Sequence, residues 1–133
     1  MRRWIVAAMM AAPLTGCGTP PGLRIPDVPE TETTQAHRLV VAGIGVDACP
    51  WYQQASEANR QAVRRAAVQA ARRLGELPDG NDTRLRDAVI RQHVMLWDTA
   101  SLSERCGYYR NLFGPAIREA EQAGEPRRPG QRR

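Results

Sequence analysis

The sequence predicts an all-α protein, a small helical bundle built on an antiparallel helix hairpin. Apolar residues recur every three or four positions from Trp51 to Leu74 and again from Leu85 to Ala100, which is the period of helices that bury one face. Between these two runs, the segment 77–81 (LPDGN) is typical of a turn that returns the chain antiparallel. A chain of 133 residues has room for one such domain.

The first sixteen residues are typical of a secretory signal peptide. Arg2 and Arg3 give a positively charged start, and an unbroken apolar run of nine residues follows from Trp4 to Ala12. This run is too short for a membrane-spanning helix, which needs about 20 apolar residues. We therefore expect an exported protein whose leader is removed.

The leader ends in Leu14-Thr15-Gly16-Cys17, which resembles the lipobox of bacterial lipoproteins. The resemblance implies that residues 1–16 are cleaved off and that Cys17 carries a diacylglycerol on its sulfur and an acyl chain on its new amino group. Several acyl chains anchor a protein durably, whereas one chain does so only marginally. Because Gly18 follows the cysteine in place of Asp, the resemblance also implies sorting to the periplasmic side of the outer membrane.

The next segment, residues 17–36, is expected to be a disordered tether between the lipid and the domain. Four prolines and two glycines fall within residues 18–34, and few apolar side chains are present to offset the entropy of ordering. After it, residues 37–46 (HRLVVAGIGV) form a β-like run interrupted by Gly43 and Gly45, with no partner strand in the chain. We expect this run to be extended or irregular and to lie against the helices.

The helical domain is predicted to span residues 37–123. Its first long helix is expected over 50–76, because a proline is favoured at a helix start, and the second over 84–100, with Asp82 or Thr83 as its N-cap. The polar arc of the second helix is narrow, with Ile90, Val94 and Trp97 beside the main apolar face. This narrow arc predicts that the second helix is the most buried element.

The remaining chain is predicted to hold two shorter helical segments. Ser101-x-x-Glu104 is a capping-box pattern that starts a segment over 105–113, and Gly114-Pro115 separates it from a short helix over 116–123. Residues 124–133 are expected to be a disordered basic tail, with arginines at 127, 128, 132 and 133.

Two cysteines remain once Cys17 is lipidated, and export places them in an oxidising compartment. Cys49 precedes the first long helix and Cys106 follows the second, so two antiparallel limbs of similar length bring them to one end. We expect a disulfide between them. The alternatives are two reduced thiols, an intermolecular bridge, or a zinc site completed by His37 and His93, whose spacing matches no known zinc finger.

The candidate functional residues predict no enzyme. His93 lies near the apolar face of its helix without a Ser, Cys or Asp partner at helical spacing, so we expect a buried, hydrogen-bonded core histidine and neither a catalytic group nor a metal ligand. Tyr108, Tyr109 and Phe113 are either core residues or a contact patch. No cofactor is expected beyond the covalent lipid on Cys17.

Charge narrows the range of ligands. The formal net charge of +5 falls to +3 when Arg2 and Arg3 are removed with the leader, and no basic stripe with interleaved aromatic residues is present, so nucleic acid is not an expected partner. One helix face is rich in arginine and could bind anionic ligands or an acidic partner. Its members are Arg60, Arg64, Arg65, Arg72 and Arg73.

These observations together predict a non-enzymatic lipoprotein, anchored by lipid to the outer membrane, that serves as an accessory or scaffold in an envelope protein assembly. The alternative is a binder of lipopolysaccharide phosphate or peptidoglycan carboxylate through the arginine-rich helix face.

Overall fold

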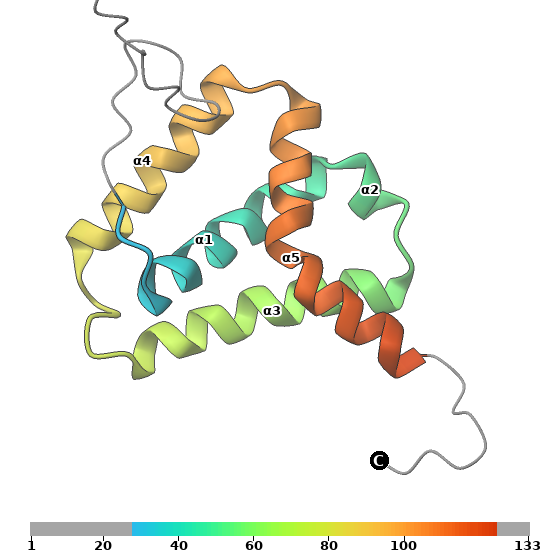
Figure 1. The fold of residues 1–133 in the computed structure, drawn as a ribbon, viewed down its shortest axis with the longest axis horizontal. Helices are drawn as coiled ribbons and strands as arrows, with labels where there is room; N and C mark the ends of the chain where they lie inside the picture. The colour runs from blue at the N-terminus through green and yellow to red at the C-terminus, as the bar shows by residue number, and fades with distance from the viewer. Residues whose placement is uncertain (1–27, 125–133) are drawn as a thin grey trace, which may run out of the picture.

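The computed structural model describes residues 28–124, and the all-α class is confirmed over this range. In chain order the elements are α1 (Glu32–Gly45), the short 3-10 helix η1 (Val46–Ala48), α2 (Pro50–Gln53), α3 (Glu57–Glu76), α4 (Thr83–Thr99) and α5 (Leu102–Gly124) (Figure 1). The predicted leader, the lipidation residue Cys17 and tail residues 125–133 lie outside the described residues.

Helix α1 corrects two expectations. It covers nearly all of the run 37–46 that was predicted to be extended, and it begins at Glu32, inside the predicted tether. A capping box closes its start, because the Thr31 side chain accepts a hydrogen bond from the Thr34 N–H and the Thr34 side chain accepts one from the Thr31 N–H. This cap, together with packing on three helices, outweighs the low helix propensity of the valines and glycines in the run.

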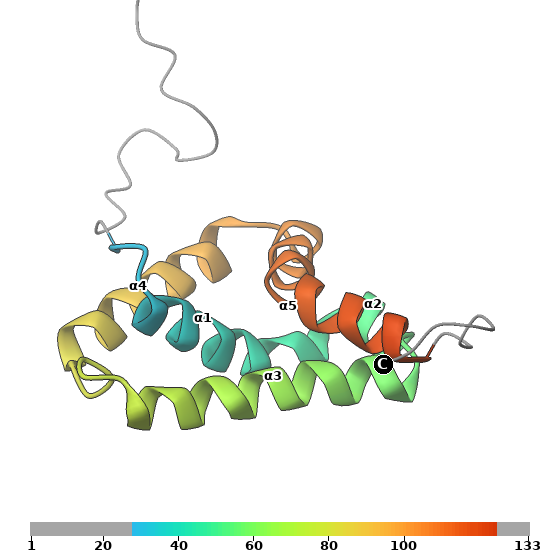
Figure 2. The ribbon, with the colours of Figure 1, turned by 60° about the horizontal axis from the view of Figure 1, so that its bottom comes forward.

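Helix α1 lies at the centre of the fold, with α3 on one side of it and α4 on the other (Figure 2). Close approach to α3 depends on Gly43, since a Cβ atom there would lie 2.7 Å from the Cβ of Ala67. Helices α3 and α4 share few direct contacts. The predicted hairpin is thus completed through α1, which packs on both of its arms.

The first long helix is divided. Helix α2 ends at Gln53, and α3 begins after Ser56, whose hydroxyl accepts a hydrogen bond from the Asn59 N–H at 3.2 Å. Serine is a favoured N-cap because it satisfies a backbone donor that has no partner within the helix. The break lets α2 turn the buried ring of Tyr52 into the core.

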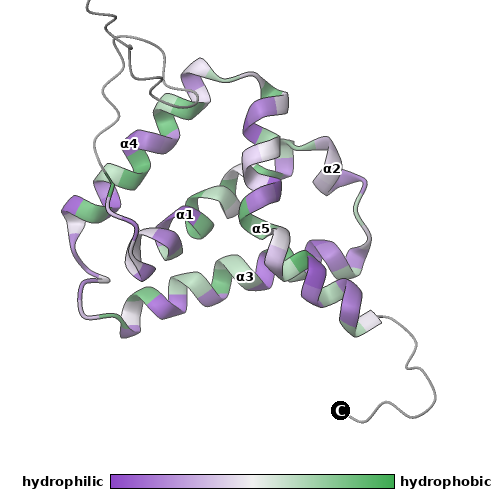
Figure 3. Ribbon diagram, viewed as in Figure 1, coloured by the Kyte–Doolittle hydropathy of each residue, from purple (hydrophilic) through white to green (hydrophobic). Residues whose placement is uncertain are grey.

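Helix α4 begins as predicted, with Asp82 as its N-cap. The expectation that it is the most buried element is wrong, because Val89 is its only fully buried residue. It contacts α1 but lies away from the main core of the bundle. Figure 3 shows the apolar segments that run along α4. The narrow polar arc of this helix therefore does not mean that its apolar residues are buried.

Helix α5 is a single element, which corrects the predicted break at Gly114-Pro115. It continues through Pro115, and Figure 1 shows a bend in its middle. A proline removes one backbone donor and commonly bends a helix without ending it. The bend lets the second half of α5 lie along α3.

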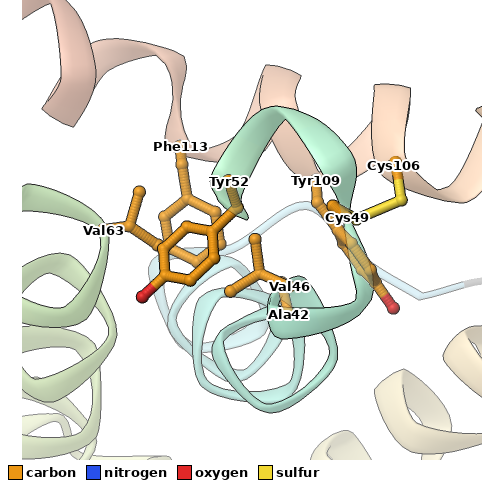
Figure 4. Close-up of a cluster of buried hydrophobic side chains, with 8 residues drawn as sticks. All are labelled: Ala42, Val46, Cys49, Tyr52, Val63, Cys106, Tyr109 and Phe113. Atoms are coloured by element: carbon orange, nitrogen blue, oxygen red, sulfur yellow. A yellow bond between two sulfur atoms is a disulfide. The ribbon is translucent and has the colours of Figure 1, made fainter. Parts of the chain in front are cut away.

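The core gathers where α1, η1, α2, α3 and α5 meet. Figure 4 shows the buried cluster, whose members are Ala42, Val46, Cys49, Tyr52, Val63, Cys106, Tyr109 and Phe113. The rings of Tyr109 and Phe113 are its largest fully buried side chains. Because the core is small, each of its large members carries a substantial part of the buried apolar area.

Candidate interaction surfaces

The predicted disulfide is present between Cys49 and Cys106, whose Cα atoms lie 5.4 Å apart. The indole N–H of Trp51 donates a hydrogen bond to the Cys106 carbonyl at 2.8 Å, so α2 is joined to α5 beside the bridge. Both sulfurs are bonded to each other, and a zinc site that uses them as thiolates is not formed. The bridge holds the start of α2 against the first half of α5 (Figure 4).

The predicted aromatic contact patch is mostly core. Tyr109 and Phe113 are fully buried, and Tyr108 is partly buried and packs against the same cluster. Of the two alternatives for these aromatic residues, core or contact patch, the structure supports the core.

His93 is half-buried and is paired with the phenol of Tyr109. Its Nε2 lies 2.8 Å from the Tyr109 hydroxyl, and the two rings stack with centroids 5.5 Å apart. Burial lowers the pKa of His93, and burial raises the pKa of Tyr109. A neutral imidazole hydrogen-bonded to a neutral phenol is a structural contact between α4 and α5.

The predicted arginine cluster is divided by ion pairs. Arg60 binds Glu57 at 2.8 Å. Arg73 binds Glu32 of α1 at 2.6 Å and Glu76 at 3.1 Å, and these hydrogen bonds raise the pKa of Arg73. Arg60 is thus paired within α3, whereas Arg73 joins α3 to the start of α1.

The other three arginines of the cluster, Arg64, Arg65 and Arg72, are exposed. Within residues 28–124 none of them has an ion pair. Val68 lies among them at helical spacing and is 51% exposed. We call these four residues the α3 outer face.

Sequence reasoning did not predict a second surface, on α4. Ile90, Val94 and Trp97 follow one another at spacings of four and three residues and are 40%, 50% and 40% exposed. The Trp97 ring stacks on His93 and carries the Arg105 guanidinium 4.0 Å above its centroid. We call Ile90, Val94 and Trp97 the α4 stripe. Their spacing indicates that they share an apolar face, but only the tertiary packing shows that this face is left largely exposed.

A shallow groove of about 220 Å³ runs between α3 and the second half of α5. Five alanines line it, and Arg65 and Glu119 stand among its polar residues. The alanines permit the two helices to lie close together, and the groove has no buried polar group directed into it. We assign it a packing role.

Across residues 28–124, no helix has the length and apolarity required to span a bilayer, and no group of three or more His, Cys, Asp or Glu side chains is placed to hold a metal ion. The chain matches no protein-family model, no curated protein and no solved structure. The α3 outer face and the α4 stripe are the exposed surfaces of the described residues that remain for a partner.

Proposed function

We propose that the protein is a lipoprotein anchored through Cys17 to the periplasmic side of the outer membrane, where it acts as a non-enzymatic accessory or scaffold for an envelope protein assembly. The observation that carries the scaffold role is the α3 outer face. An exposed valine surrounded by three arginines without ion pairs is suited to a protein partner that has an apolar side chain beside carboxylates.

The anchor is supported by the signal-peptide layout and by the four residues that end at Cys17. Mass spectrometry of the amino-terminal peptide of the exported protein tests it directly. Loss of residues 1–16 with a lipid-sized mass on Cys17 is the expected result. An unmodified thiol at Cys17 would remove the anchor from the proposal.

The scaffold role is tested by replacing Val68 with a photo-crosslinking amino acid in cells and isolating the adducts from the envelope. We expect one discrete protein adduct that is lost when Arg64 and Arg65 are changed to Glu. The same crosslinker at Asn111, an exposed position on α5, is the matched control and should give no such adduct. If position 68 gives no protein adduct, the scaffold role on this face is wrong.

The three arginines also favour a second candidate, a binder of anionic envelope polymers. The two candidates respond differently to Val68→Asp. A protein partner would be lost because its apolar contact is removed, whereas binding to a phosphate-rich polymer would be weakened only modestly by one added carboxylate. Polymer binding should also fall steeply between low and physiological salt, because screening acts on exposed charges over about 8–10 Å.

A further inference from the structure

We propose that the α4 stripe docks the domain flat on the bilayer that holds its lipid anchor, so that α4 faces the membrane and the α3 outer face points away from it. This inference rests on the proposed lipidation of Cys17 and adds an interaction surface and an orientation to it. The occupant of the stripe is thus a phospholipid surface.

The chain enters the described domain beside α4, within reach of the bilayer. Only ten residues, 18–27, separate Cys17 from the first described residue, Val28, and even fully extended they span at most about 35 Å. The segment from Val28 to Thr31 leads into α1 beside α4, as the two views of Figures 1 and 2 agree. The α1 start is also tied to the α3–α4 turn, because the Thr33 hydroxyl donates a hydrogen bond to Asp79.

The stripe has the chemistry of a membrane-interface helix. Ile90 and Val94 offer aliphatic side chains, and Trp97 offers a large ring of the kind enriched at the level of lipid headgroups. The Arg105 guanidinium lies over this ring and donates one hydrogen bond, to the Trp97 carbonyl at 3.2 Å. Arg105 has no carboxylate partner in the described part of the chain, so its remaining terminal N–H donors are left for a lipid phosphate.

Charge beside the stripe adds little to membrane binding. Among residues 82–105, the unpaired Arg91 and Arg105 are matched by two unpaired carboxylates, Asp98 and Glu104. Three apolar side chains would bind a bilayer weakly by themselves. A short tether raises their effective concentration at the surface to the millimolar range, so a weak contact is sufficient.

The position of α3 gives the proposal its functional consequence. Helix α1 separates α3 from α4 (Figure 2), so a domain that rests on the α4 stripe keeps the α3 outer face clear of the bilayer. Docking would thus hold the partner-binding face in a fixed direction, which a flexible tether alone would not do.

The test uses the processed lipoprotein, with its lipid verified by mass spectrometry, reconstituted into vesicles of phosphatidylethanolamine and phosphatidylglycerol whose acyl chains are brominated. Trp51 and Trp97 are the tryptophans of the processed chain. We expect bromine to quench the emission of Trp97, and Trp97→Phe to abolish the quenched component.

The matched variants are Val94→Asp and Val68→Asp, which place the same carboxylate on the two sides of the molecule at positions 50% and 51% exposed. Val94→Asp should abolish quenching while circular dichroism stays unchanged, and Ile90→Asp should repeat the effect. Val68→Asp should leave quenching intact. A verified lipoprotein that stays on the vesicles with unquenched Trp97 would overturn the docking and leave the anchor standing, whereas an unmodified Cys17 would overturn both.

Discussion

At the scale of single residues, two glycines five positions apart have opposite effects on stability. Gly80 is buried in the α3–α4 turn, and a Cβ atom there would overlap the carbonyl oxygen of Leu74. Gly75 lies in the last turn of α3, where a Cβ atom would meet nothing within 4 Å. The first glycine is required by close backbone approach, and the second only raises the entropy cost of forming the helix.

Alanine substitutions should separate these roles. Gly80→Ala should lower the free energy of unfolding by about 2 kcal/mol or more, because backbone must move to admit the methyl group. Gly75→Ala should raise it by about 0.5–1 kcal/mol, because alanine is the better helix former. Urea titrations monitored by circular dichroism measure both. Equal effects of the two substitutions would contradict this account of the turn.

The two histidines predict how stability depends on pH. Burial and the nearby Arg86 lower the pKa of His37, against a smaller opposing effect of Asp79, and burial lowers the pKa of His93. Well above the ordinary histidine pKa of about 6.5, both imidazoles are neutral whether the chain is folded or unfolded. As the pH falls below this value, the unfolded chain takes up protons that the folded chain resists, so the free energy of unfolding must fall.

The measurement is a series of urea titrations between about pH 7.5 and 5.5, a window chosen around the ordinary histidine pKa. Stability should decrease toward the acid end, and a His37→Gln/His93→Gln double variant should show a flatter profile. A wild-type protein that grows more stable as the pH falls would show that one of these imidazoles has gained a partner for its charged form.

At the scale of elements, the start of α3 depends on its N-cap. The Ser56 hydroxyl accepts the Asn59 N–H, and α3 provides the surface on which α1 and the second half of α5 pack. Ser56→Ala should therefore cost about 1 kcal/mol of stability, measured by thermal or urea unfolding. Ser103→Ala, an exposed change inside α5, is the control and should cost nothing. Equal losses in both variants would contradict a capping role for Ser56.

Local signals in the sequence predicted the two long helices α3 and α4, although α1 was missed and α5 was divided. The N-cap at Asp82 and the helical state of α3 and α4 are predicted correctly. Both depend on residues that lie close together in the sequence. Residues 37–46 were misread as extended, since valine and glycine content argues against a helix when considered alone. Their helical state depends on α3, α4 and α5, which pack around them from distant parts of the chain.

The candidate surfaces were less predictable than the helices. The ion pair between Arg73 and Glu32 joins residues 41 positions apart, and no local pattern indicates it. The α4 stripe was visible as an apolar face, but its exposure follows from the position of α1, which covers only the neighbouring face of α4. Spacing thus predicts which residues share a helix face, whereas the arrangement of helices determines which faces are left exposed.

At the scale of the whole molecule, stability depends on a small core joined by one bridge. The disulfide connects residues 57 positions apart and thereby holds α2 against α5, the two elements that carry Tyr52, Tyr109 and Phe113. Closing a loop of this length restricts the unfolded chain by about 4 kcal/mol on the chain-entropy model. That amount is comparable to the whole stability of many small domains, which is about 5–15 kcal/mol.

Loss of the bridge should therefore bring the domain close to unfolding. A Cys49→Ala/Cys106→Ala variant of the processed protein should lose about 4 kcal/mol, visible as a much lower urea midpoint, and wild-type protein treated with a reductant should show the same midpoint. The variant itself should not respond to the reductant, which makes it the internal control. If reduction left the wild-type midpoint unchanged, the contacts of the core alone would be sufficient, and the requirement for an oxidising compartment would lose its physical basis.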